Sequence, residues 1–125
     1  MKSAAVFVGL CAVAIPAWWL VLFQSPEWRR FFVPDSAWAG FRFVVVPDLL
    51  LATATGIVTL QMARGRVPVL FDAVLGGWVY ATAFSVAWAV SVGAPTSGPA
   101  LMVAALVGFV LVWYAVVPTR QASRR

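Results

Sequence analysis

The sequence predicts an all-α integral membrane protein, a four-transmembrane-helix bundle with its N- and C-termini in the cytoplasm. The 125 residues are 63% hydrophobic and 10% charged, whereas a soluble domain averages roughly 45–50% apolar and about 25% charged. A domain of this size has too little interior to bury so much apolar surface, so the excess must face lipid. Four long apolar runs and a segregation of Arg residues complete the argument.

The first predicted span covers residues 3–23 and follows Lys2. Its beginning resembles a signal peptide, but the apolar run continues through a tryptophan pair to Phe23. That is longer than the roughly 7–15 residues of a signal core, so we expect a retained helix. Cys11 lies within this run and is the only cysteine of the chain, which excludes an intrachain disulfide.

An external aromatic and basic loop is predicted over residues 24–40. Trp and Phe mixed with charged residues are typical of the lipid headgroup layer. The stretch 27–32, EWRRFF, predicts a short helix on the membrane surface. Asp35 and Ser36 are expected to cap a further turn that leads into the next span. Four side chains are candidate contacts for an anionic lipid headgroup or a protein partner: Arg29, Arg30, Trp38 and Arg42.

The second, third and fourth spans are predicted at about 41–62, 69–92 and 99–117. Four spans of roughly 20 residues each would use about two thirds of the chain. Residues 1–125 therefore form a single membrane domain, and the short connections leave no room for a soluble catalytic domain.

The positive charges orient this bundle. Those on the side of the termini are Lys2, Arg64, Arg66, Arg120, Arg124 and Arg125. The other side has three arginines, Arg29, Arg30 and Arg42, whose charge is balanced by the acids Glu27, Asp35 and Asp48. By the positive-inside rule both termini are cytoplasmic. The frequent arginine, the single lysine and the absence of asparagine are typical of a GC-rich genome, which favours a bacterial cytoplasmic (inner) membrane.

Small residues recur at every fourth position of the third span, namely Ala73, Gly77, Ala81, Ser85 and Ala89. Membrane helices pack where small residues let their backbones approach. The pattern has two interpretations: packing within one chain, or a face for a homo-oligomer or a membrane-protein partner.

A candidate intramembrane polar site lies on the second span. Ionisable groups at membrane depth are costly and favour a functional hypothesis. Asp48, Thr55 and Thr59 fall on one helical face, with Ala52 between them. A transporter could use this stripe to bind a cation or relay a proton. The structural alternative is that Asp48 is a helix-start acid, stabilised by the helix dipole or by Arg42.

The chain lacks the residues that several classes of enzyme and metalloprotein require. The chain has no histidine, which removes the commonest metal ligand and general base. It has no nucleophile beside a base and no Gly-rich phosphate loop, so neither a metal nor a cofactor is expected. The net charge of +5 reflects arginines at span ends, and we do not expect nucleic-acid binding.

Three functions follow, in order of preference. The first is a non-enzymatic accessory or scaffolding subunit of a larger membrane assembly, in contact with membrane lipids. The second is a small oligomeric proton- or cation-coupled transporter that uses Asp48. The third is a lipid-modifying membrane enzyme, which the absence of histidine disfavours.

Overall fold

The computed structural model describes residues 2–66 and 68–123, which are helical with short connections and contain no strand. The elements in chain order are α1 (Lys2–Gln24), α2 (Pro26–Phe32), α3 (Asp35–Phe41), a 3-10 turn η1 (Arg42–Val44), α4 (Val45–Ala63), α5 (Phe71–Val92) and α6 (Ser97–Ser123). Arg124 and Arg125, which contribute to the predicted cytoplasmic charge, lie outside the described residues.

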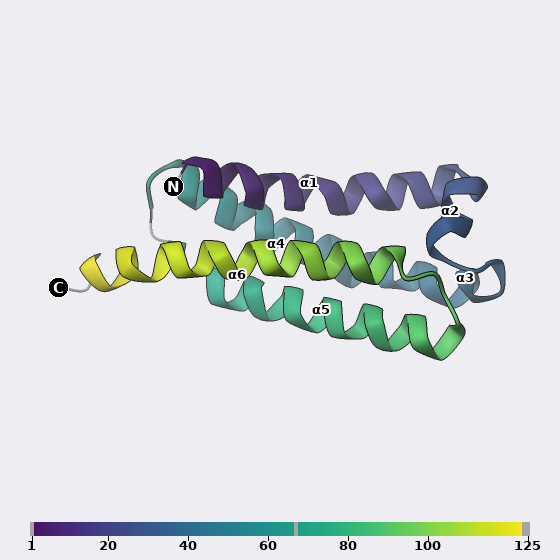
Figure 1. Ribbon diagram of the computed structural model, residues 1–125. Coiled ribbons are helices and arrows are strands. Elements are labelled where there is room, and N and C mark those ends of the chain that lie inside the picture. Colours follow the sequence, from purple (N-terminus) through teal and green to yellow (C-terminus); the bar gives the residue numbers. More distant parts are fainter. Residues whose placement is uncertain (1, 67, 124–125) are drawn as a thin grey trace.

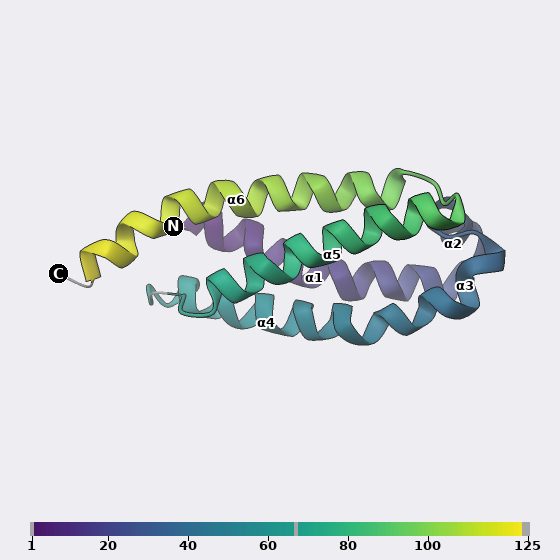
Figure 2. The same ribbon diagram turned by 90° about the horizontal axis from the view of Figure 1, so that it is seen from below.

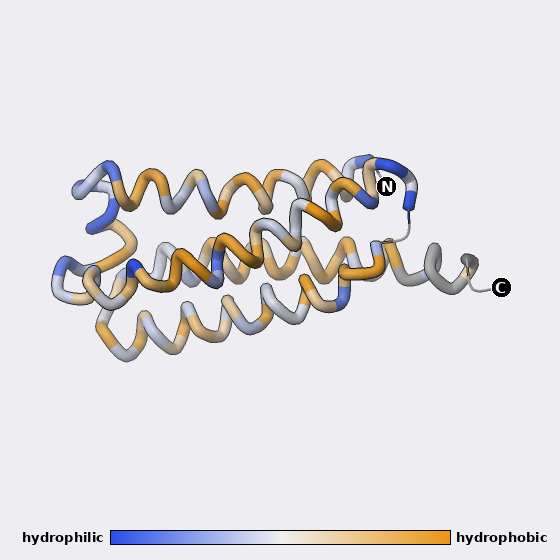
Figure 3. The backbone as a smooth tube through the Cα atoms, turned by 180° about the vertical axis from the view of Figure 1, so that it is seen from behind, coloured by the Kyte–Doolittle hydropathy of each residue, from blue (hydrophilic) through white to orange (hydrophobic). Residues whose placement is uncertain are grey.

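Four helical stretches are long and apolar enough to cross a membrane: Lys2–Gln24, Asp35–Ala63, Phe71–Val92 and Ser97–Val116. The sequence prediction of four such helices in an all-α chain is therefore confirmed for the described residues. The most hydrophilic segments gather at the two ends of the bundle (Figure 3). This distribution is typical of a protein whose middle lies in hydrocarbon.

The four long helices run side by side, with both termini at one end and α2 and α3 at the other (Figures 1 and 2). Consecutive spans pair most extensively, α1 with α4 and α5 with α6. The bundle is thus two helical hairpins laid against each other. Contacts between α4 and α5 and between α1 and α6 join the hairpins.

Two buried clusters fill the bundle. The larger lies toward the end that holds the termini and contains Val8, Val58, Phe71, Trp78 and Phe109 among others. Aromatic rings pack against each other in this cluster, where Trp78 stacks on Phe109 with ring centroids 4.8 Å apart. The smaller cluster, made of Trp19, Leu22, Val33 and Phe41, lies at the other end, where α2 and α3 close over α1.

Two glycines let helices approach closely. A Cβ on Gly77 of α5 would lie 2.8 Å from Leu51 Cδ1 of α4. A Cβ on Gly108 of α6 would overlap the ring of Phe7 of α1. Side chains at these positions would force the helices apart, which agrees with the role of small residues in membrane bundles.

The predicted loop 24–40 is mostly helical. Ser25 caps α2 by accepting the Trp28 backbone N–H at 3.4 Å, and Pro26 fits the first helical position. The predicted cap at Asp35 and Ser36 is wrong. Pro34 is the N-cap of α3, and its side chain has no acceptor for a cap bond. The Asp35 carboxylate is instead engaged with Arg29 and Arg30 of α2.

The ends of the spans differ from the prediction by one or two residues at most positions and by more in two places. The second span is preceded without a break by α3 and η1, so the helical path starts at Asp35 rather than at residue 41. The fourth helix continues through Pro118 to Ser123. A proline inside a helix removes one backbone hydrogen bond, here the one that residue 118 would donate to the carbonyl of residue 114. Gly93, with a φ of +67°, ends α5 in the left-handed conformation.

Candidate functional site

Asp48 lies in the first turn of α4 and is half-buried against α1. The indole N–H of Trp19, a residue only 2% exposed, donates to Asp48 Oδ2 at 2.9 Å. No hydrogen bond to Oδ1 is present among the described residues. The alternative pairing with Arg42 is not observed among the described residues. The Arg42 guanidinium instead lies 5.5 Å from the centroid of the Phe43 ring.

Thr55 lies about two turns further along the same face of α4 and is fully buried. Its hydroxyl donates to the Leu51 carbonyl at 2.7 Å and accepts the indole N–H of Trp78 at 3.2 Å. Thr59 donates to the Thr55 carbonyl at 2.9 Å and is partly buried. The predicted stripe therefore faces protein, and both threonine hydroxyls are bonded within the bundle.

A third bond of the same kind lies at the opposite end of the molecule. The indole N–H of Trp113, on α6, donates to Asp72 Oδ1 in the first turn of α5 at 3.1 Å. Each of the three bonds joins two different helices: α1 to α4, α5 to α4, and α6 to α5. Interhelical hydrogen bonds of this type stabilise bundles in lipid.

Two acceptors of this network, Asp48 and Thr55, were predicted from the sequence, whereas Asp72 and the three tryptophan donors were not. A signal was present, because donor and acceptor lie at matching depths. Trp19 and Asp48 both lie near the end of the bundle opposite the termini, Trp19 late in the first span and Asp48 early in the second. Tryptophans near span ends are usually explained as interfacial anchors, and that explanation hid their bonding partners.

Three of the four candidate contact residues gather near Asp35, at the end of the bundle opposite the termini. Arg30 Nε lies 3.0 Å from Asp35 Oδ2, and an Nη of Arg29 lies 3.7 Å from Oδ1. The Arg29 guanidinium also lies 4.8 Å from the centroid of the Trp38 ring. Arg29, Arg30 and Trp38 thus connect α2 to α3, while Arg42 stands apart from them over Phe43.

The small-residue face of the third span is used mainly inside the chain. Gly77 lies against Leu51, and Ala89 is 7% exposed. Ala81 and Ser85 are partly buried, whereas Ala73 is exposed. A spacing of four drifts by roughly 40° per step on a helix of 3.6 residues per turn, so the stripe winds out of the interface. Contact of this face with a partner stays a prediction.

Comparison with models of known families, with curated proteins and with solved structures finds no match. Arguments about function therefore depend on the residues of this chain. Within residues 2–66 and 68–123, no three His, Cys, Asp or Glu side chains come close enough to hold a metal ion.

Proposed function

We propose that the chain is a non-enzymatic accessory or scaffolding subunit of a larger membrane assembly. In this proposal its four spans cross a bacterial cytoplasmic membrane and both termini lie in the cytoplasm. The main support is that polar side chains of the long helices bond to other helices of the same chain. Asp48, Thr55 and Asp72 each accept an indole N–H from another helix, so their polarity stabilises the bundle itself.

The alternative is an oligomeric proton- or cation-coupled transporter, and one observation favours it. Asp48 keeps one carboxylate oxygen, Oδ1, that accepts no hydrogen bond among the described residues. A carboxylate at membrane depth with a spare oxygen suits a coupling group. Against this, the Thr55 hydroxyl beyond it already makes two bonds, which leaves it poorly suited to bind an ion.

Native mass spectrometry of the chain, released gently from its own membrane, tests the first proposal. A complex of fixed stoichiometry with a second membrane protein is the expected result. A defined multiple of the 13.5 kDa subunit alone would contradict the proposal and favour a transporter.

The transporter is tested separately by ion flux into vesicles that contain the purified chain. Asp48→Asn keeps a carbonyl oxygen for Trp19 but removes the charge. The transporter requires a flux in the wild-type protein that this variant loses while its mass spectrum stays unchanged. Equal fluxes in the two proteins would exclude Asp48 as the coupling group.

A further inference from the structure

A hollow of about 390 Å³ lies between the last turns of α1 and the short helix α2. Its lining is mostly apolar, and the residues are Trp18, Val21, Gln24, Ser25, Trp28 and Phe32. The volume falls within the range of roughly 300–1,000 Å³ that is typical of small-molecule pockets. Since α1 is long enough to cross a bilayer, its last turns lie at the boundary between hydrocarbon and headgroups.

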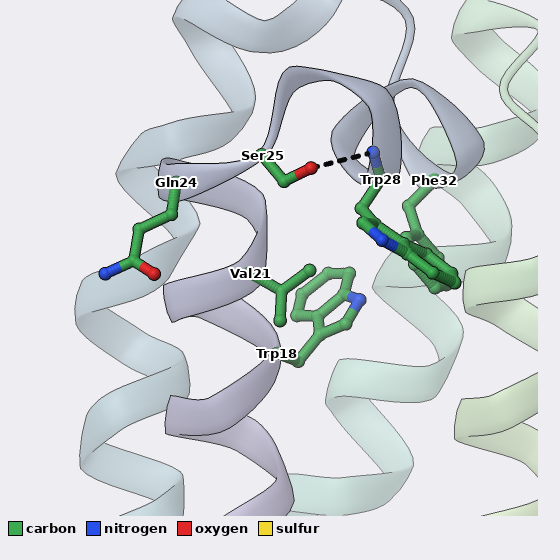
Figure 4. A pocket seen from close by; sticks show the side chains of 6 residues that line it. All are labelled: Trp18, Val21, Gln24, Ser25, Trp28 and Phe32. Carbon is green, nitrogen blue, oxygen red and sulfur yellow. Dashed lines mark hydrogen bonds between the residues drawn. The ribbon is translucent and has the colours of Figure 1, made fainter.

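Two tryptophans face this hollow from different helices, Trp18 from α1 and Trp28 from α2 (Figure 4). Three other tryptophans donate their indole N–H groups to acceptors of neighbouring helices. The indole N–H groups of Trp18 and Trp28, in contrast, have no acceptor among the described residues. An indole N–H usually finds a hydrogen-bond partner when it is buried. Trp18 is partly buried, whereas Trp28 is 60% exposed and can donate to a group outside the chain.

The charged residues of α2 and the Asp35 that pairs with them indicate the kind of lipid that fits the hollow. Glu27, Arg29, Arg30 and Asp35 sum to zero. Both arginines are also within ion-pair distance of Asp35, at 3.7 and 3.0 Å. The helix α2 together with Asp35 therefore offers no net positive charge to an anionic headgroup, although it contains two arginines.

We propose that the hollow binds one acyl chain of a zwitterionic phospholipid of the leaflet that contacts α2. Val21, Trp18 and Phe32 contact the hydrocarbon. The indole N–H groups of Trp18 and Trp28 donate to the ester carbonyl oxygens, which lie at the same depth. The site is independent of the accessory-subunit proposal, because it depends only on the geometry of α1 and α2.

Native mass spectrometry of the purified full-length chain, titrated with a synthetic zwitterionic phospholipid, tests the site. The wild-type protein is expected to retain one lipid at low lipid concentration. Val21→Trp fills the hollow and is expected to abolish this retention. Leu20→Trp is the matched control, since Leu20 is the neighbouring residue, is 59% exposed and does not line the hollow. It should bind as the wild type does.

A second, smaller substitution tests the site in case Val21→Trp loses lipid only because it misfolds. Trp28→Phe keeps an aromatic ring at a position that is 60% exposed and removes the N–H donor together with the five-membered ring that carries it. Loss of one hydrogen bond is expected to weaken lipid retention about three- to tenfold. Equal retention by the wild type, Val21→Trp and Trp28→Phe would overturn the site.

The headgroup is tested by repeating the titration with an anionic phospholipid of the same acyl chains. Zwitterionic and anionic lipids should be retained within about threefold of each other, or with a preference for the zwitterionic lipid. A tenfold or greater preference for the anionic lipid would overturn the headgroup assignment and restore the arginines as its contacts.

Discussion

The Thr55 hydroxyl is at once a donor to its own helix and an acceptor for the buried indole of Trp78. Thr55→Val keeps the shape of the side chain but leaves the Trp78 N–H without its partner. An unsatisfied buried donor costs about 1–3 kcal/mol, so we expect the free energy of unfolding to fall by that amount. Denaturation of the protein in mixed micelles with increasing sodium dodecyl sulfate measures it.

Thr53→Val is the matched control for this prediction. Thr53 lies on the same helix and is exposed, and its hydroxyl bonds only to the Leu49 carbonyl. We expect a change of less than about 0.5 kcal/mol there. Equal losses in the two variants would show that the Trp78 bond has no special role.

The bond between Trp19 and Asp48 should be measurable as a coupling energy. In a double-mutant cycle of Trp19→Phe and Asp48→Ala, the single variants should each destabilise the bundle. Their combination should cost less than the sum by about 0.6–2 kcal/mol, the range for interhelical bonds in membranes. Strict additivity would mean that the 2.9 Å contact contributes nothing to stability.

The polar stripe of α4 was predictable from the sequence, but its partners were not. Spacing along one helix places Asp48, Thr55 and Thr59 on one face without any knowledge of other helices. The neighbour that completes each bond depends on the rotation of another helix about its own axis. Tryptophan is frequent at span ends for an unrelated reason, its affinity for the interface, so composition does not single out Trp19 or Trp113.

At the scale of elements, the close approach of α1 and α6 depends on Gly108. In Gly108→Ala the new Cβ would overlap the Phe7 ring, and Phe7 packs edge-on against Phe109 with centroids 5.6 Å apart. Overpacking of this kind costs about 1–3 kcal/mol. The variant should unfold at a correspondingly lower detergent fraction.

Gly76→Ala provides the comparison. Gly76 is an exposed helical glycine of α5, and a Cβ there would have open space around it. The substitution should leave stability unchanged or raise it by up to about 1 kcal/mol, the difference in helix propensity. If both glycine variants behave alike, the α1–α6 contact is not limited by the Phe7 ring.

Element types were easier to predict than element ends. Long apolar runs identify spans because every backbone group in lipid must be bonded within a helix. The segment 24–40 was harder, since its two helices have seven residues each. Such short helices depend on tertiary contacts more than on propensity. Here the ion pairs of Asp35 and the burial of Val33 and Phe41 supply those contacts.

At the scale of the whole molecule, the arrangement predicts which segments are accessible from each side of the membrane. In a Cys11→Ser background, single cysteines at Ser36 and at Arg64 report opposite ends of the bundle. A membrane-impermeant thiol reagent applied to intact cells should label Ser36→Cys and not Arg64→Cys. Inverted vesicles should give the reverse pattern. Labelling of Arg64→Cys in intact cells would refute cytoplasmic termini.

The pairing of consecutive spans has a consequence for biosynthesis. Because α1 packs on α4 and α5 packs on α6, each hairpin can form as soon as its second span leaves the ribosome. Contacts between the hairpins, such as the Trp78–Thr55 bond, the Phe7–Phe109 ring contact and the approach of Gly77 to Leu51, then let them recognise each other. Two separately translated halves, divided in the connection between α4 and α5, should therefore reassemble when expressed together. Copurification of an untagged half with a tagged one is the measurement.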